Sequence, residues 1–314
     1  EVTNMTIKTL KKSNLKEARI ILADLYFKLK DFRKVYNLLN NDSIETRYLM
    51  DFAYDLISEN QLDLAEEVYT EMLRSNQDRI IMEKVIFNLA YIFEKKTITD
   101  IDPLPISGLL KHNTFFNNHF LKLEEKQSES LWQAIHIYDS LLTSTNSVEA
   151  NYRLGEIRYR ILGDLDGAMQ HYKDVIENKR NTKLIIECVS RIADVYIAKG
   201  DLNSAENVLV QYIDDIRLKK FKTELEIKQA QLYFLKGELD TLNAHFKNKL
   251  NLLSLDNELF NDILEIRSLL AYFQQSQEWF KPFAEIQLLL QQNKREEALE
   301  KLTPFLTNSN STLA

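Results

Sequence analysis

The sequence predicts an all-α protein, an α-solenoid of about seven stacked helical hairpins. The 314-residue chain contains only 6 Gly and 4 Pro, far below their typical combined share of roughly 12%. All-β sandwiches and barrels need turn residues about every 8–12 positions, so they are excluded. In addition, one pattern of small, aromatic and turn residues recurs along the chain at intervals of 30 to 37 residues. Repeats of this length are typical of solenoids built from helical hairpins.

The recurring pattern has a fixed spacing. A small residue is followed after three positions by an aromatic residue, then after four by a turn residue, after five by alanine and after four by a large apolar residue. Residues 188–213 carry it as Ala193, Tyr196, Gly200, Ala205 and Leu209. The turn glycines Gly163, Gly200 and Gly237 lie 37 residues apart twice over. The predicted hairpins cover residues 21–39, 50–73, 81–142, 150–176, 188–213, 227–246 and 285–302.

This pattern resembles the tetratricopeptide repeat family, whose period is about 34 residues. The resemblance covers nearly the whole chain, although the units are irregular and the Pro that often closes a repeat is absent. It implies a right-handed superhelix in which the first helix of each hairpin lines a concave groove for a peptide or protein. We therefore expect a single solenoid domain over residues 1–314.

Each part of the pattern has a physical role. Small residues let the two helices of a hairpin approach closely, and the neighbouring aromatic side chain fills the space beside them. Glycine or asparagine at the turn tolerates positive φ. An aspartate at the start of the second helix accepts hydrogen bonds from its first amides; the aspartates at this position are Asp31, Asp164 and Asp201. In residues 150–176 the small residue, Gly155, falls one position early, which predicts an extra residue or a π-bulge in that helix.

The third hairpin contains an insertion over residues 97–130, about 32 residues longer than the pattern allows. Long unstructured loops are uncommon and often functional, and this one is too apolar for a disordered linker. One interpretation is a short helix near residues 113–123 that folds back and buries its phenylalanines. The other is a segment that lies in the groove or presents an apolar patch to a partner. The candidate contact residues are Leu109, Leu110, Phe115, Phe116 and Phe120.

A second irregular region covers residues 256–314. We expect helices over residues 256–275 and 277–293, with Pro282 either kinking the second helix or marking its first turn. A final helix from Lys294 is charged on one face, as is typical of a cap that ends a solenoid.

The sequence shows no constellation for catalysis. The five histidines form no metal-binding pair, the single Cys188 has no neighbouring His, and no nucleophile motif occurs. The net charge of −7 argues against nucleic acid as a partner, and no apolar run is long enough to span a bilayer. We expect no enzyme activity, cofactor or metal, and a soluble chain, cytoplasmic or, if a signal sequence was removed, periplasmic.

The predicted function is a protein-interaction scaffold that binds a peptide or protein in the groove. The alternative is a structural arm of a larger assembly, such as an outer-membrane biogenesis, secretion or glycosyltransferase complex. The Lys and Asn constellation by which one subset of the family grips a C-terminal carboxylate cannot be assembled here. The residues expected to line the groove are Tyr54, Asn88, Tyr91, Arg153, Arg160, Arg191, Asp194 and Gln231.

Overall fold

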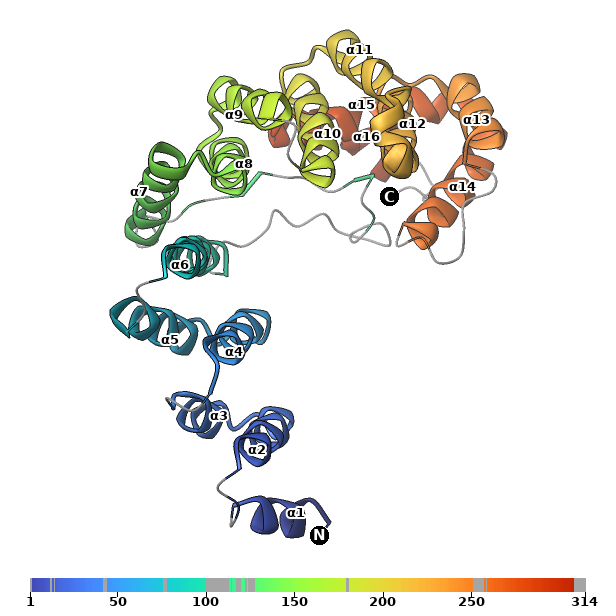
Figure 1. The fold of residues 1–314 in the computed structure, drawn as a ribbon. Coiled ribbons are helices and arrows are strands. Elements are labelled where there is room, and N and C mark those ends of the chain that lie inside the picture. Colours follow the sequence, from blue (N-terminus) through green and yellow to red (C-terminus); the bar gives the residue numbers. More distant parts are fainter. Residues whose placement is uncertain are drawn as a thin grey trace. The chain divides into compact units, whose positions relative to one another are not determined.

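The computed structural model describes residues 2–11, 13, 15–41, 44–75, 78–99, 113, 115–116, 120–121, 123, 128–178, 181–250, 257 and 259–307. Within these residues it contains sixteen α-helices, one π-helical segment and one 3-10 segment, and no β-strand (Figure 1). Fourteen of the α-helices pair as seven helical hairpins, which confirms the predicted all-α class and the hairpin number. None of the described helices is both long and apolar enough to cross a bilayer.

The chain divides into two compact units, which are described separately. Unit 1 comprises Glu1–Asp100 and Glu124–Thr145, and unit 2 comprises Ile101–Leu123 and Asn146–Ala314. The single domain expected over residues 1–314, and the boundaries expected for the insertion and the C-terminal region, stay predictions.

Unit 1 consists of one short helix followed by three hairpins. The helices are α1 (Val2–Leu10), α2 (Lys16–Lys28), α3 (Phe32–Leu39), α4 (Thr46–Ser58), α5 (Leu62–Ser75), α6 (Arg79–Thr99) and α7 (Ser128–Thr145). Successive helices pack against each other, so α3 contacts α4 and α5 contacts α6. The small residues Ala53 and Ala65 are fully buried, as is Tyr69 beside them. The core of unit 1 therefore runs continuously through stacked hairpins, none of which could bury its apolar faces alone.

Unit 2 contains the remaining hairpins and one unpaired helix. Its elements are α8 (Val148–Ile157), the π-helical segment Arg158–Leu162, α9 (Leu165–Asn178), α10 (Thr182–Ala198), α11 (Leu202–Ile213), the 3-10 segment Ile216–Phe221, α12 (Lys222–Leu235), α13 (Leu239–Asn248), α14 (Phe260–Gln275), α15 (Gln277–Gln291) and α16 (Arg295–Thr307). The helix α15 packs against both α10 and α12. One face of these repeats is therefore covered by a later part of the same chain.

The turns have the geometry that their residues predict. Gly163, Gly200 and Gly237 adopt φ values of 67°, 81° and 71°, and Asn60 and Asn293 adopt 57° and 60°. An aspartate precedes each of the helices α3, α9 and α11, and its side chain accepts the backbone N–H of the residue three positions later. These aspartates are Asp31, Asp164 and Asp201. These contacts satisfy amides that the first turn of a helix leaves unpaired.

The predicted irregularity after Gly155 is confirmed as the π-helical segment Arg158–Leu162. Gly155 lies against Tyr172 of α9, and a Cβ atom at this position would come within 2.7 Å of the tyrosine Cε1. The small residue therefore allows the close approach of α8 and α9, and the extra residue of the π-turn restores the register before Gly163.

Two local predictions meet the structure only in part. The described residues of the expected helix over 113–123, which are 113, 115–116, 120–121 and 123, are not helical, and its other residues lie outside the described part of the chain. The side-chain Oδ1 of Asn113 accepts the backbone N–H of Phe115 at 3.1 Å, and side-chain bonds of this kind compete with helix formation. The Asn113 carbonyl accepts the backbone N–H of Phe116 at 3.0 Å, which closes a turn. Pro282 lies inside α15 (Gln277–Gln291), as predicted, but in its second turn and not its first; the kink at Pro282 stays a prediction.

Candidate protein-interaction site

The first helices of the hairpins in unit 2 carry a buried row of charged and amide side chains, here called the ion ladder. It consists of Glu156 on α8, Arg191 and Asp194 on α10, and Lys228 and Gln231 on α12. Glu156, Asp194 and Gln231 each follow the small residue of their repeat, and each basic residue lies three positions before the acid or amide of its own helix. Equivalent positions of successive first helices therefore build the ladder.

Each base of the ladder joins two consecutive repeats. The Arg191 guanidinium donates to both carboxylate oxygens of Glu156, at 2.8 and 3.1 Å, and to Oδ2 of Asp194 at 3.3 Å. The Lys228 ammonium in turn pairs with Asp194 and donates to Oε1 of Gln231 at 2.6 Å. Bidentate pairs of the kind that Arg191 forms are strong and directional, so the ladder specifies how neighbouring hairpins stack.

Glu156 and Arg191 of the ladder favour their charged forms. Burial alone would raise the pKa of Glu156, but attraction by Arg191 and Arg160 and a hydrogen bond from the Tyr172 hydroxyl at 2.8 Å outweigh it and lower that pKa. Burial likewise would lower the pKa of Arg191, whereas Glu156 and Asp194 raise it well above its usual value. The buried charges are thus compensated by one another.

The ladder ends on the insertion. The Gln231 side chain donates Nε2–H to the backbone carbonyl of Phe115 at 2.8 Å. The Asn113 side chain donates to the carbonyl of Asp262 at 3.0 Å and to Oε2 of Glu265 at 2.9 Å, both on α14. A non-helical segment is therefore held by the side chains and backbone of two helices.

The phenylalanines of this segment enter a group of rings here called the aromatic socket, which is formed by Phe234 of α12, Phe246 of α13 and Phe283 of α15. The Phe116 ring meets Phe234 edge-on at 5.3 Å between centroids and Phe283 at 6.3 Å. The Phe115 ring lies 6.4 Å from that of Phe246. Both side chains are only 2% exposed, so the burial agrees with the first interpretation of the insertion.

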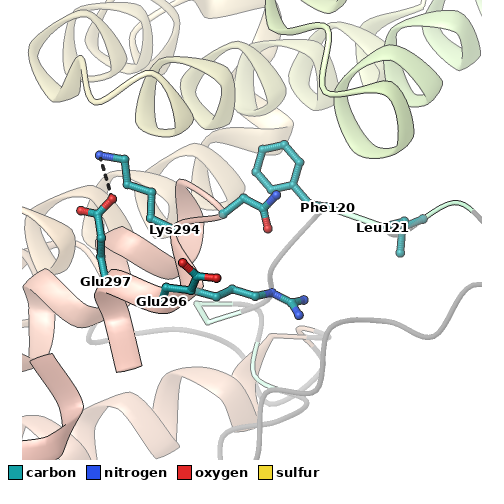
Figure 2. Close-up of a pocket in the computed structure, with 7 residues that line it drawn as sticks. Phe120, Leu121, Lys294, Glu296 and Glu297 are labelled. Carbon is teal, nitrogen blue, oxygen red and sulfur yellow. Dashed lines mark ion pairs between the residues drawn. The ribbon is translucent and has the colours of Figure 1, made fainter. Parts of the chain in front are cut away.

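A second contact of the insertion involves the π-helical segment and a shallow pocket. Leu121 donates its backbone N–H to the carbonyl of Arg160 at 2.6 Å, and the Phe120 ring meets Tyr159 edge-on at 5.3 Å. A pocket of about 500 Å³ lies beside these residues, and its lining residues are Phe120, Leu121, Asn293, Lys294, Arg295, Glu296 and Glu297. Figure 2 shows Phe120 and Leu121 across this pocket from the charged first turn of α16. The predicted contact residues Leu109 and Leu110 lie outside the described residues.

The groove residues predicted in unit 2 lie on or beside the ladder. Asp194 and Gln231 are 4% and 3% exposed. Asp194 is paired with Arg191 and Lys228, and the Gln231 side chain contacts the backbone of the insertion at Phe115. The Arg191 side chain is 20% exposed, and Arg160 places its guanidinium 3.8 Å from Glu156. Arg153 is half-buried on α8. The structure thus brings these five residues to one region of unit 2, where most of their polar groups bind other parts of the chain.

The groove residues predicted in unit 1 lie on α4 and α6. Tyr54 is 58% exposed, whereas Asn88 is half-buried and donates its side-chain N–H to the Tyr69 hydroxyl at 3.0 Å. Tyr91 is half-buried, with the Lys95 ammonium 5.5 Å from its ring centroid. Tyr54 and Tyr91 each follow the small residue of their repeat. They therefore occupy the position that carries the acids and the amide of the ladder in unit 2.

Glu156 and Lys228 are not among the groove residues predicted from the sequence. The signal was present, because Arg191 and Lys228 are 37 residues apart, as are Asp194 and Gln231. Glu156 lies 38 residues before Asp194, and the π-turn accounts for the extra residue. A comparison of charges at equivalent repeat positions would have found the ladder, but not its burial.

Residues 149–180, which include nearly all of α8 and α9, match the family model of the tetratricopeptide repeat. The resemblance inferred from the sequence is confirmed. A crystal structure of a tetratricopeptide repeat protein from Parabacteroides merdae aligns with 84% of this chain and 79% of its own, at 14% identity and a TM-score of 0.42. No curated protein matches the chain.

Proposed function

We propose that the chain is a non-catalytic tetratricopeptide-repeat scaffold that binds a protein partner through the first helices of unit 1. The observation that carries this proposal is the exposed Tyr54, which stands with Tyr91 at the repeat position that is buried in unit 2. Tyrosine is enriched in protein interfaces and among the residues that dominate their affinity. Two tyrosines at equivalent positions of α4 and α6 offer helical anchors that are already ordered before the partner arrives.

The chemistry of the described side chains supports a binding role. Cys188 is fully buried, and burial strongly raises the pKa of its thiol, so it stays protonated and inaccessible as a nucleophile. The carboxylates Glu156 and Asp194 are neutralised by bases and hold the repeats together. The buried charged side chains of the ladder therefore stabilise the fold.

Photo-crosslinking tests this proposal. A benzophenone amino acid is placed at Tyr54, and the full chain is incubated with extract of its source cells. As a matched control the same group replaces Val210, which is 52% exposed on the second helix α11. We expect a discrete protein adduct from position 54 and none from position 210.

The purified partner then allows a quantitative measurement. The combined change Tyr54→Ala with Tyr91→Ala should weaken binding at least tenfold, or about 1.4 kcal/mol, with an unchanged circular dichroism spectrum. Identical adducts from positions 54 and 210, or unchanged affinity of the double variant, would show that this face does not bind the partner.

A further inference from the structure

The described residues between 113 and 123 belong to unit 2 and contact its helices in the manner of a peptide ligand. We infer that the aromatic socket, together with Gln231 and the start of α14, is a recognition site for a peptide turn with two adjacent aromatic residues. In this structure the chain's own Asn113 and Phe115–Phe116 fill the site. The inference rests on the proposed scaffold function and adds a second, separate site with a stated ligand chemistry.

Hydrogen bonds to the backbone are the first evidence. The Gln231 amide donates to the carbonyl of Phe115, which is a group that any peptide offers at that position. Its Oε1 is meanwhile held by Lys228, so the ladder orients the amide toward the insertion. Preorganised donors of this kind lower the cost of ordering a ligand.

A side-chain contact adds selectivity at one end. The Asn113 amide reaches the Asp262 carbonyl and the Glu265 carboxylate together. Two acceptors require a side chain that donates twice, and both hydrogens of an Asn or Gln amide meet this requirement. The site therefore favours an amide residue two positions before the first aromatic residue.

The aromatic contacts supply the apolar part. Phe115 and Phe116 lie next to each other in the sequence, yet they meet rings from three different helices. These three helices are separate elements of unit 2, whereas the insertion lies between two helices of unit 1 in the sequence. Burying two aromatic side chains among other rings contributes several favourable interactions at once. An aromatic pair from another chain would find the same partners once the socket is vacant.

The experiment uses the full chain with Phe115→Ala and Phe116→Ala, which empties the socket. The probe is a fluorescently labelled synthetic peptide of residues 111–118, KHNTFFNN, and a peptide with both phenylalanines replaced by alanine is the control. Fluorescence polarisation should show saturable binding of the probe to the variant. The unaltered chain, whose socket is filled, should bind the probe at least tenfold more weakly, and the control peptide should bind the variant at least tenfold more weakly.

Two results would overturn the inference. One is equal binding of both peptides to the variant, and the other is no binding to a variant that retains its helical circular dichroism. If the double variant loses helicity, excess probe should restore it, and the milder Phe116→Leu variant should bind the probe more tightly than the unaltered chain does. Failure of both of these measurements would also overturn the inference.

This test is independent of the proposed scaffold function. It contains no partner protein and does not involve Tyr54, so its failure leaves the proposal for unit 1 standing. Conversely, peptide binding to the emptied socket would persist if position 54 formed no adduct.

Discussion

Glu156 and Arg191 are opposite charges that lie largely out of water, and each contacts more than one partner. Removing one member of a buried ion pair leaves the other uncompensated, which is far more costly than the pair itself is stabilising. The ladder therefore contributes to the specificity of stacking between α8, α10 and α12, because a shift of one hairpin would leave these buried charges without their partners.

We predict that Glu156→Gln destabilises the chain by about 3 kcal/mol or more, because it leaves the buried guanidinium with only part of its compensation. The exposed pair Asp24 and Lys28, 2.9 Å apart on α2, provides the control, because surface pairs contribute little. Urea unfolding followed by circular dichroism should show a large shift for Glu156→Gln and almost none for Asp24→Asn. Equal shifts would mean that the ladder carries no special energetic weight.

The buried His245 makes stability depend on pH. Burial lowers its pKa from the usual 6.5, although its Nε2–H donates to the carbonyl of Glu226 at 2.8 Å. The unfolded chain binds the proton near pH 6.5, whereas the folded chain resists it until a lower pH. The contribution of neutral His245 to the stability of the folded chain is present above pH 6.5. It is lost as the pH falls through the lowered pKa that His245 has in the folded chain.

Lowering the pH from about 7.5 to about 5.5 should therefore reduce the melting temperature of the unaltered chain, and His245→Gln should reduce this dependence. Glutamine can still donate a hydrogen bond to Glu226 but does not titrate. Thermal melts at the two pH values provide the measurement, and an equal pH dependence in both proteins would rule out His245 as its source.

At the scale of the element, the hairpins depend on a few small residues and turns. Gly155 shows this most directly, because Tyr172 occupies the space where its Cβ would lie while donating to Glu156. Gly155 lies one position earlier in its repeat than the small residues of the other repeats. The π-helical segment Arg158–Leu162 accommodates this one extra residue before the turn at Gly163.

We predict that Gly155→Ala destabilises the chain by about 1–3 kcal/mol, because overpacking forces the buried Tyr172 ring to move. The matched control is Gly163→Asn, at a turn with φ of 67° where a Cβ would meet no atom within 4 Å and where asparagine is tolerated. Urea unfolding midpoints should rank the control near the unaltered chain and Gly155→Ala clearly below it. A reversed ranking would contradict the packing explanation.

At the scale of the whole molecule, the insertion changes the role of the residues around it. The repeat position that remains accessible at Tyr54 is buried at Asp194 and Gln231. The same repeat position thus holds a candidate partner contact in unit 1 and a rung of the ladder in unit 2. In the aromatic socket, the chain's own Phe115 and Phe116 pack against the rings of three helices of unit 2.

Local features of the fold were predictable from the sequence. The turn glycines, the capping aspartates and the extra residue after Gly155 act within one helix or one turn, so their spacing alone indicates them. The candidate site was less predictable. Asp194 and Gln231 follow the repeat pattern, but the pattern does not say whether their face meets solvent, a partner or another part of the chain.

Helix periodicity, small residues and turn residues act over short distances, and for this reason the amino-acid sequence is enough to specify an all-α chain of seven hairpins. What the faces of these hairpins do depends instead on packing between distant segments. The contacts of Phe115 with Gln231 and of Asn113 with Glu265 join residues more than 110 positions apart. Burial of the ladder arises from such long-range packing, which no repeat of 37 residues encodes.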